Sequence, residues 1–467
     1  MEDKFRDECG IFGIYSKDVD VAQAAFLGLY ALQHRGQESA GIVTSRDGEM
    51  LHHRGMGLVQ QVFDEETLNK LDGEFAIGHV RYSTTGESRI ENAQPVVVRY
   101  KKGKMAVAHN GNLVNALLLK EELENEGSIF QSTIDSEVII HLIARSKKTS
   151  TREALAEALK RVEGAYSLIL MTEDELIGVR DPSAFRPLCI GLLGDSYCLA
   201  SESCALEQIG AEYIRPVEPN EMVVIDKNGL KSYPLNQPRP ISMCIFELIY
   251  LSRPDSIVFG KSVYLTRKEF GRLLAREHPV EADLVIPVPD SGIPAAIGYS
   301  EESGIPYDMG LLRNHYVGRT FIQPGAFFRS SKVRIKLSPV SEMIKGKRVV
   351  IVDDSIVRGT TSKEIVKMLK NAGAKAIHFL ISSPPVNYPC FYGIATPTRE
   401  ELLAAIYNND TDQIRDYLGA DSIHYLSMEG LMSAMGKDHS QFCRACFNGE
   451  YPVAPIDMIR REALKNC

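Results

Sequence analysis

Short apolar segments separated by turn residues dominate the first half of the chain. Gly, Asn and Asp between such segments are typical of a sheet-rich domain. The strands predicted in this way include residues 9–15, 41–44, 75–80, 105–109, 167–171 and 196–201. Apolar residues at three- and four-residue spacing predict helices over residues 21–34 and 135–145. We expect Asp135 to cap the second helix.

The pattern changes after a proline-rich stretch. Residues 234–240 (PLNQPRP) hold three prolines in seven positions, which predicts a linker. Beyond it, the apolar patterns predict strands at 284–287, 348–352 and 376–382, a helix from Ile293, and a helix over 360–372 that ends at Gly373. Strand, helix and strand at this spacing predict a parallel α/β sheet, with ligands at the carboxyl ends of its strands.

Composition narrows the class of protein. A length of 467 residues predicts two or three domains. Lys and Arg total 53 against 61 Asp and Glu, a net charge of −8, so a nucleic-acid-binding surface is not expected. No apolar run is long enough to span a membrane, and the charged start MEDKFRDE is not a secretory signal, so the cytoplasm is the expected compartment. Nine cysteines in such a compartment are metal ligands, catalytic groups or core residues rather than cross-links.

A fourteen-residue string in the second half combines a strand, two acids and a turn. Residues 349–362 read VVIVDDSIVRGTTS. The turn and the following helix start offer backbone N–H groups and hydroxyls to an anion. The carboxylates of Asp353 and Asp354 suit Mg²⁺ and sugar hydroxyls instead. Each piece alone could be a polar turn after a buried strand, but the whole string favours a phosphate-sugar site.

This string resembles the signature of the phosphoribosyltransferases. The resemblance implies that Asp353 and Asp354 bind ribose and Mg²⁺. It implies that the 5′-phosphate is held by Ser355, Arg358, Gly359, Thr360, Thr361 and Ser362. The turn at 289–292 (PDSG) matches the family's pyrophosphate loop, with Asp290 and Ser291 as substrate ligands and Ser291 also near the metal.

Residues 313–336 lie between these two motifs and are basic. Their cations are Arg313, Arg319, Arg329, Lys332, Arg334 and Lys336. An isolated run of this kind is usually a solvated loop. Beside a phosphate site, a lid that shields the reaction from water is the better interpretation, and in the resembled family this loop closes over the substrate.

Four strings in the first half belong together. Cys9 begins CGIFGI, and a cysteine at the head of a strand is by itself more often a packing residue. Its companions are QHRGQESAGI from Gln33, GHVRYSTTG from Gly78 and HNGNL from His109. Together they resemble the N-terminal-nucleophile glutamine amidotransferases over residues 9 to about 225. Amide hydrolysis needs a thiolate, a base and oxyanion donors, which this set can supply.

In that family the base is the α-amino group of the nucleophile itself. A free α-amine has a reference pKa of about 7.7 to 8.0, which suits proton transfer near neutral pH. We therefore expect residues 1–8 to be a propeptide whose removal frees Cys9; the alternative is a start of no consequence. The resemblance makes Asn110 and Gly111 the oxyanion hole, although Asn-Gly is also a common hairpin turn.

The resemblance also assigns the glutamine pocket. Arg81 would pair with the α-carboxylate and Asp135 with the α-amino group of glutamine. Thr84 would line the same pocket, and Arg35 would orient the surroundings of the nucleophile.

Four further cysteines suggest a metal or redox site. Cys443 and Cys446 form a C-x-x-C pair, and Cys244 and Cys390 lie far upstream. The spacing leaves zinc, a redox pair and an iron–sulfur cluster open, with a redox pair disfavoured because the motif does not start a helix after a thioredoxin-like strand. The sequence contexts resemble a propeptide-bearing subgroup that holds a [4Fe–4S] cluster on these four cysteines.

The other cysteines have no assigned chemistry. We expect core positions for Cys189, Cys198 and Cys204, and no role for the terminal Cys467. Family members often carry an acid where this chain has Ala395, and we assign that position no role.

Taken together, the chain resembles the glutamine-dependent amidophosphoribosyltransferases over residues 9 to about 455. The resemblance implies an α+β, αββα glutaminase domain (9–235) and an α/β phosphoribosyltransferase domain with a parallel sheet and an iron–sulfur region (241–467). It implies ammonia transfer from glutamine to phosphoribosyl pyrophosphate at the start of purine synthesis, a channel between the sites, Mg²⁺, inhibition by purine nucleotides and a homotetramer.

Two rivals remain: an amidotransferase with another acceptor, and a non-catalytic regulator. The string from Val349 argues against the first. The acidic charge balance and the intact nucleophile and lid motifs argue against the second.

Overall fold

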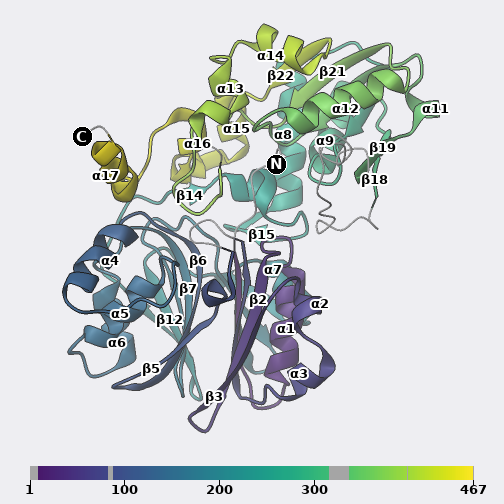
Figure 1. The fold of residues 1–467 in the computed structure, drawn as a ribbon. Coiled ribbons are helices and arrows are strands. Elements are labelled where there is room, and N and C mark those ends of the chain that lie inside the picture. Colours follow the sequence, from purple (N-terminus) through teal and green to yellow (C-terminus); the bar gives the residue numbers. More distant parts are fainter. Residues whose placement is uncertain (1–8, 83–87, 315–335, 397, 466–467) are drawn as a thin grey trace.

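Two bodies built on different kinds of sheet make up the chain (Figure 1). The computed structural model describes residues 9–82, 88–314, 336–396 and 398–465. The first body, lower in Figure 1, is a pair of sheets with helices on both outer sides. The second body lies above it and surrounds a parallel sheet.

The first sheet has seven strands with β1 at its centre. β1 pairs antiparallel with β10 on one side and β4 on the other. In spatial order the strands are β11 (Glu212–Pro216), β9 (Cys189–Leu193), β10 (Ser196–Ala200), β1 (Gly10–Tyr15), β4 (Phe75–Arg81), β2 (Ser39–Arg46) and β3 (Glu49–Met56). The helices on its outer side are α1 (Val21–Ala31), α2 (Val59–Val62), α3 (Glu65–Asn69) and α7 (Ser203–Gln208). α1 starts where predicted because the Asp20 carboxylate caps the free N–H groups of Ala22 and Gln23.

The second sheet has six antiparallel strands. In spatial order they are β13 (Gly229–Pro234), β12 (Glu221–Asp226), β8 (Leu176–Arg180), β7 (Gly164–Met171), β6 (Gly103–Leu113) and β5 (Val96–Tyr100). Its outer face is covered by α4 (Ala116–Asn125), α5 (Glu137–Arg145) and α6 (Thr151–Ala158). Ile11 and Ile77 of the first sheet pack against Ile169 and Val223 of the second. The order helix, sheet, sheet, helix confirms the predicted αββα class.

The predicted cap of α5 is wrong. The helix begins at Glu137 with Ser136 as its N-cap. The carboxylate of Asp135 accepts instead from the N–H groups of Leu113 (2.8 Å) and Ser136 (2.8 Å). The Asp135 side chain therefore bonds to a distant residue of β6, Leu113, instead of capping the helix as the local pattern predicted.

The parallel sheet of the second body confirms the predicted α/β pattern. Its strands are β17 (Leu284–Pro287), β20 (Arg348–Asp353), β21 (Ala376–Ile381) and β22 (Ser422–Tyr425), in that spatial order. Alternate residues of β20 face opposite sides, so Val350 packs with α8 (Val263–Glu277) and α9 (Ile293–Ser303). Ile351 packs on the other side with α12 (Thr360–Asn371) and α14 (Thr411–Leu418). The carboxyl ends of β17 and β20 thus lie next to each other.

Short elements complete the second body. They are β14 (Met243–Cys244), a π-helical turn (Glu247–Leu251), β15 (Ile257–Val258), β16 (Lys261–Ser262), β18 (Leu311–Arg313), β19 (Leu337–Pro339), α11 (Ser341–Ile344), α13 (Leu403–Ile406), α15 (Met428–Ala434), β23 (Phe442–Cys443) and α16 (Ala445–Asn448). Two short 3₁₀ turns in this body are Arg399–Glu401 and Gly436–Gln441, and one in the first body is Ile90–Asn92.

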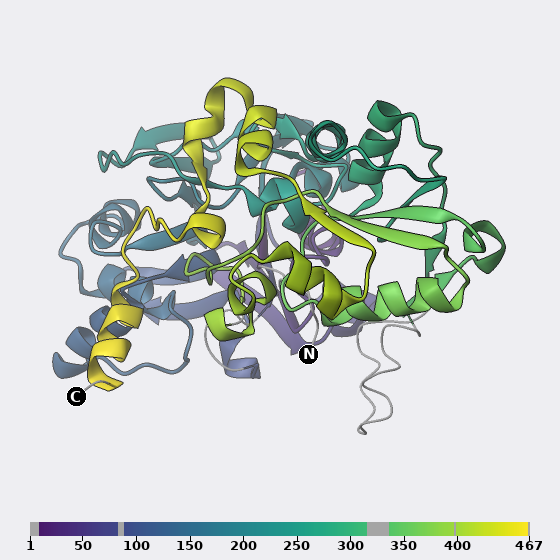
Figure 2. The ribbon, with the colours of Figure 1, turned by 90° about the horizontal axis from the view of Figure 1, so that it is seen from above.

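The last helix, α17 (Ile456–Lys465), returns to the first body. The view from above shows it beside the helices of the second sheet (Figure 2). The Asp457 carboxylate accepts from the first-turn N–H groups of α4, at Leu117 (2.8 Å) and Leu118 (3.1 Å). An acid at a helix start satisfies free N–H groups and is favoured by the helix dipole. The sequence predicted a single domain over 241–467. It did not predict that the end of this domain, α17, also contacts the first body.

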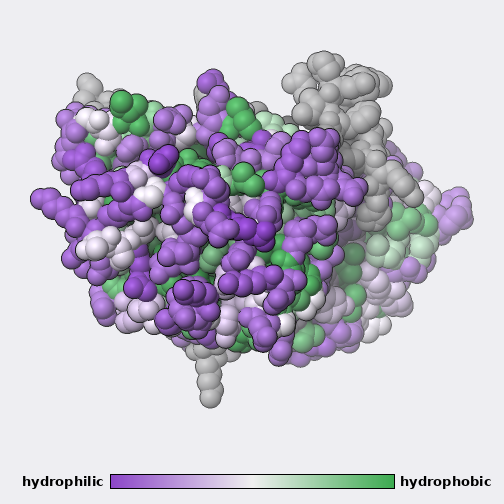
Figure 3. Space-filling view, turned by 90° about the horizontal axis from the view of Figure 1, so that it is seen from below, coloured by the Kyte–Doolittle hydropathy of each residue, from purple (hydrophilic) through white to green (hydrophobic). Residues whose placement is uncertain are grey.

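The face of the molecule seen from below is mostly hydrophilic, with apolar residues scattered among polar ones (Figure 3). Among the described residues, no helix has the length and apolar character needed to cross a bilayer.

Candidate active sites

Cys9 lies buried immediately before β1, with 7% of its surface exposed. Its thiol donates to the Tyr82 carbonyl at 3.6 Å, and its own carbonyl accepts from Arg35 Nε at 3.0 Å. Burial raises the pKa of the Cys9 thiol to about 11. The thiol is therefore protonated at neutral pH, and nucleophilic attack requires a base beside it.

The predicted oxyanion residues lie on β6. Asn110 is fully buried, and neither its Nδ2 nor its Oδ1 has a hydrogen-bond partner among the described residues. Leaving a buried amide unpaired costs about 1–3 kcal/mol, so such a group is rare in a folded protein. Gly111 has φ +146°, and a Cβ there would lie 2.1 Å from the Ala165 carbonyl oxygen, so only glycine fits. The Asn110 amide is thus available to donate to an oxyanion, and the neighbouring Gly111 leaves room for one. The oxyanion forms only during the reaction, which is consistent with an amide that, among the residues described, is unpaired in the resting protein.

Arg81 and Asp135 supply opposite charges near the thiol. Both act electrostatically on Cys9. Arg81 is buried, with Nη1 at 3.7 Å from Glu38. Burial acts to raise the pKa of Asp135, but His109, with Nδ1 at 3.4 Å, and two backbone N–H donors hold it below its ordinary value. An ionised pair of this kind matches the two charged groups of an α-amino acid. Thr84 lies outside the described residues.

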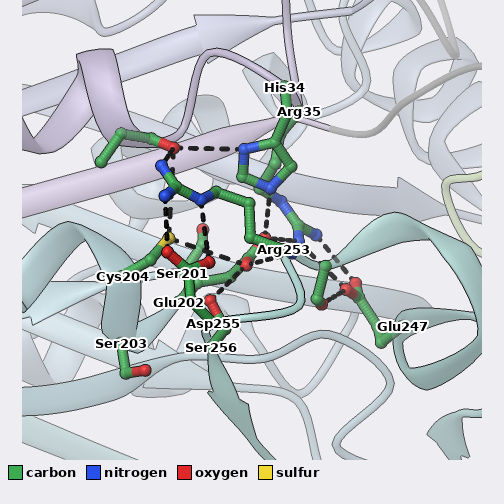
Figure 4. Close-up of polar contacts among 12 residues, drawn as sticks. His34, Arg35, Ser201, Glu202, Ser203, Cys204, Glu247, Arg253, Asp255 and Ser256 are labelled. Carbon is green, nitrogen blue, oxygen red and sulfur yellow. Dashed lines mark hydrogen bonds and ion pairs between the residues drawn. The ribbon is translucent and has the colours of Figure 1, made fainter. Parts of the chain in front are cut away.

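Arg35 does more than the sequence predicted. Figure 4 shows its guanidinium between two carboxylates, Glu202 of the first body and Glu247 of the second. Nη1 donates to Glu202 at 2.6 Å, and Nη1 and Nη2 donate to Glu247 at 3.0 and 2.8 Å. Burial lowers the pKa of Arg35, but the two carboxylates raise it well above its usual range. The cation that holds the Cys9 carbonyl is thus fixed by a residue from each body.

Glu247 is completely buried, so its removal leaves the Arg35 charge undercompensated. We expect Glu247→Ala to lower the free energy of unfolding by about 3–5 kcal/mol, as for other buried ion pairs that lose one partner. Urea unfolding measures this. Asp412→Ala, which breaks an exposed pair with Arg415, is the control and should cost less than about 1 kcal/mol. If both variants lost the same free energy of unfolding, the buried ion pairs would contribute no more to stability than an exposed pair.

The acid pair follows β20 as predicted. Asp353 and Asp354 are each 1% exposed at the carboxyl end of the strand. Asp353 accepts from the N–H of Asp354 at 2.9 Å, and Asp354 accepts from the Ser355 hydroxyl at 2.6 Å. Burial lowers the pKa of Arg267 to about 10, and the charge of Asp354 opposes that shift. The Asp354 carboxylate therefore lies close enough to the buried Arg267 guanidinium to interact with it electrostatically.

The predicted phosphate turn leads into α12. Gly359 is its N-cap, with φ +75°, and a Cβ there would lie 2.7 Å from Leu403. The N-cap residue is a glycine, which has no side chain to cap the helix, and N–H groups at a helix start are suited to binding an anion. Arg358 Nη2 donates to Glu401 at 3.2 Å. Thr360 is exposed, Thr361 half-buried and Ser362 buried, so the turn offers both hydroxyls and backbone N–H groups.

The predicted pyrophosphate loop lies beside this turn. The N–H of Val288 donates to the Val352 carbonyl at 2.8 Å, and a Cβ on Gly292 would lie 2.5 Å from the same oxygen. Asp290 is exposed and pairs with Arg313, and Ser291 is half-buried. The two loops predicted from separate motifs thus meet at one sheet edge. Of the predicted lid, residues 315–335 lie outside the described part of the chain, including Arg319, Arg329, Lys332 and Arg334.

Four cysteines line one cavity between the bodies: Cys244, Cys390, Cys443 and Cys446. β14 and β23 pair in parallel and place Cys244 opposite Cys443. The Cys446 carbonyl accepts from the N–H groups of residues 387 and 388, and Cys390 Sγ accepts from the Tyr392 N–H at 3.3 Å. Burial and the neighbouring thiols raise the pKa of Cys446 well above its ordinary value. The structure thus gathers residues up to about 200 positions apart in the sequence.

The remaining cysteines behave as expected where they are described. Cys189, Cys198 and Cys204 are buried in the core of the first body, and Cys467 lies outside the described residues. Within those residues, no three His, Cys, Asp or Glu side chains converge closely enough to hold a single metal ion.

Sequence motifs missed the residues that join the bodies. Glu202 and Arg186 stand outside the motifs. Glu247 and Gly393 lie in the sequence contexts of Cys244 and Cys390, and Asn112 lies inside HNGNL, but none of these three has a distinct signal of its own. Each of the five acts through a contact with a residue distant in the sequence, which local patterns do not encode.

Comparison with known families matches both halves. Residues 79–208 match the family described as a glutamine amidotransferase domain. Residues 270–383 match the phosphoribosyl transferase domain.

Similar proteins align over nearly the whole chain. Amidophosphoribosyltransferase of Bacillus subtilis is 50% identical, over 96% of this chain and 94% of that protein. Its counterpart in Methanothermobacter thermautotrophicus is 47% identical, over 100% of this chain and 99% of that protein. The chloroplastic amidophosphoribosyltransferase 1 of Arabidopsis thaliana is 50% identical, over 98% of this chain and 81% of that protein.

A solved structure has the same fold. Glutamine phosphoribosylpyrophosphate amidotransferase from B. subtilis, complexed with ADP and GMP, superposes with a TM-score of 0.91 at 49% identity. The superposition covers 96% of this chain and 98% of that chain.

Proposed function

The chain belongs to the amidophosphoribosyltransferase family, and we infer from this that it transfers the amide nitrogen of glutamine to phosphoribosyl pyrophosphate. The products are 5-phosphoribosylamine, glutamate and pyrophosphate, and the reaction is the first committed step of purine synthesis. One observation carries this function: one body holds a buried cysteine together with a buried amide that has no hydrogen-bond partner among the described residues, and the other holds an acid pair that runs into a glycine-capped turn.

At the first site, the Cys9 thiol attacks the glutamine carboxamide. The α-amine of a freed Cys9 takes the thiol proton and passes it to the departing ammonia. The Asn110 amide and the Gly111 N–H stabilise the oxyanion. Arg81 and Asp135 hold the α-carboxylate and α-ammonium of the substrate. Water then hydrolyses the thioester, which releases glutamate and restores the thiol.

This scheme requires that residues 1–8 be removed. The raised pKa of the Cys9 thiol supports the requirement, because among the described residues the thiol donates to a carbonyl, which is not a base at neutral pH. Intact-mass measurement of the active protein should give a chain that begins at Cys9. Full activity in a chain that still begins at Met1 would refute the proposal.

At the second site, ammonia adds to the anomeric carbon as the bond to pyrophosphate breaks. Asp353 and Asp354 accept hydrogen bonds from the ribose hydroxyls. The turn 355–362 holds the 5′-phosphate with its hydroxyls and helix-start N–H groups. Asp290 and Ser291 contact the pyrophosphate side. The buried carboxylates and Ser291 fit Mg²⁺, which would stabilise the charge of the departing pyrophosphate.

The alternative function is that of an amidotransferase that transfers ammonia to a different acceptor. Glutamate release from glutamine is measured with phosphoribosyl pyrophosphate, with other sugar phosphates, and with neither. We expect strong stimulation by phosphoribosyl pyrophosphate alone. Equal stimulation by a hexose phosphate would favour the rival.

The four-cysteine cavity supports a [4Fe–4S] cluster. Four thiols on one small cavity, one of them accepting a backbone N–H, match the cysteine ligands and hydrogen bonds of such clusters. The cluster would tie the chain end to the body that carries Cys244 and Cys390.

Anaerobically purified protein should show broad visible absorbance and bound iron. Cys443→Ser should lose both, whereas Cys198→Ser, at a buried core cysteine outside the cavity, should retain them. A colourless protein that contains stoichiometric zinc would contradict the cluster.

We extend three further properties of the resembled proteins to this chain. Because a relative was solved with ADP and GMP, purine nucleotides are proposed as feedback inhibitors. A homotetramer and a cytoplasmic location are proposed as well. Sedimentation velocity, with and without AMP and GMP, tests the assembly.

A further inference from the structure

Residues 390–393 (CFYG) of the second body pack against the oxyanion strand of the first. Gly393 has φ +111°, and a Cβ there would lie 3.0 Å from the carbonyl carbon of Gly111 and 3.1 Å from its Cα. Two glycine backbones therefore meet with no side chain between them. A larger residue at position 393 must push the Gly111 peptide aside or move the loop.

A hydrogen bond holds the side chain of the next residue of the strand. Asn112 Nδ2 donates to the Phe391 carbonyl at 2.9 Å, across 279 positions of sequence. β6 pairs with β7 as far as Leu113, but with β5 only as far as Val107. Within the part of the chain that the structure describes, the segment that contains Asn110 and Gly111 thus has a strand ladder on one edge only. Residues 391–393 supply a second support.

The loop itself is anchored rigidly. The Tyr392 carbonyl accepts from Arg186 Nε at 2.9 Å and Nη2 at 2.6 Å, and the Tyr392 hydroxyl donates to the Val453 carbonyl at 2.6 Å. The Tyr392 and Phe185 rings stack at 4.2 Å between centroids. Arg186 and Tyr392 are both buried. A support held this firmly can set the position of a neighbouring backbone.

We propose that Gly393 and the Phe391 carbonyl are positioning groups for the oxyanion donors, so that the second body completes the geometry of the glutaminase site. The inference rests on the proposed role of Asn110 and Gly111. Gly393 does not contact the reacting atoms; it determines where the Gly111 N–H and the Asn110 amide lie. A Cβ at position 393 requires a shift of a few tenths of an ångström in the Gly111 peptide. Since a misplacement of about 1 Å costs on the order of 10²-fold in rate, this smaller shift should cost on the order of tenfold.

Gly393→Ala tests the proposal. We expect kcat for glutamine hydrolysis to fall on the order of tenfold, with the KM for glutamine within about threefold because Arg81 and Asp135 bind the substrate's α-groups elsewhere. Ammonia-dependent synthesis should not change. Alkylation of Cys9 by iodoacetamide, a displacement at saturated carbon that forms no oxyanion, should keep its wild-type rate.

Gly346→Ala is the matched control. Gly346 lies in the same body with φ +75°, and an added Cβ would meet nothing within 4 Å. An alanine at this position also has a positive φ, although one nearer the left-handed region than that of Gly393, and it lacks the backbone contact, so its glutamine kcat should stay within about twofold of wild type.

Unchanged glutamine kcat in Gly393→Ala, or an equal loss of the ammonia-dependent reaction, overturns the proposal. If that variant does not fold, Asn112→Ala decides: about a tenfold lower glutamine kcat is expected, and an unchanged kcat overturns the proposal. A wild-type protein that uses ammonia but not glutamine would instead overturn the proposed function of the first site.

Discussion

Cys9→Ala will abolish glutamine-dependent formation of 5-phosphoribosylamine while the ammonia-dependent reaction continues. The loss should be at least about 10³-fold, since no other described group can replace the nucleophile. The second site binds phosphoribosyl pyrophosphate with its own residues and needs only ammonia. Product formation with glutamine and with ammonium chloride at raised pH, measured on one preparation, gives both numbers.

Cys198→Ala is the control for this experiment. Cys198 is also buried in the first body, on β10, which pairs with β1. Its loss should leave both nitrogen sources usable. A Cys9→Ala protein that still used glutamine at the wild-type rate would rule out Cys9 as the nucleophile.

Asp354→Asn will reduce the synthesis of 5-phosphoribosylamine from both nitrogen sources, unlike Cys9→Ala, which affects only the reaction with glutamine. The change removes a buried negative charge from the end of β20, where the proposed scheme places ribose and Mg²⁺. We expect a loss on the order of 10²-fold or more with either glutamine or ammonia. Hydrolysis of glutamine without phosphoribosyl pyrophosphate should persist at its basal rate, because the first site is intact.

Asp283→Asn provides the comparison at the other edge of the same sheet. Asp283 is exposed and pairs with Arg348, at the amino end of β20. It should leave both activities within about twofold, as expected for a surface ion pair. If Asp354→Asn reduced only the glutamine reaction, the division of labour between the two bodies would be wrong.

The parts of the fold that could be predicted depend on local signals. The strand before Asp353, the Gly359 turn and α12 follow one another within about twenty residues, so their pattern is complete in the sequence. The central strand β1 and helix α1 are recognisable for the same reason. β3 carries His52, His53 and Arg54, and its partly exposed, polar pattern gave no strand signal.

The parts that could not be predicted depend on contacts between distant residues. Asp135 has the right residue type for a helix cap, but the Leu113 N–H competes for its carboxylate. The burial of Glu247 against Arg35, the return of α17 to α4 and the meeting of Gly393 with Gly111 each join the two bodies. No periodicity or motif predicts such contacts, because the two partners lie far apart in the sequence and neither changes the local pattern around the other.

Coupling between the two sites is the central claim, and its most direct measurement is the ratio of glutamate to pyrophosphate released in one reaction. With glutamine as the only nitrogen source, the trimmed, metal-replete protein should release the two in a ratio near one, and each release should be strongly stimulated by the other substrate above its basal rate. Glutamate release without matching pyrophosphate, under conditions where phosphoribosyl pyrophosphate is bound, would contradict the claim.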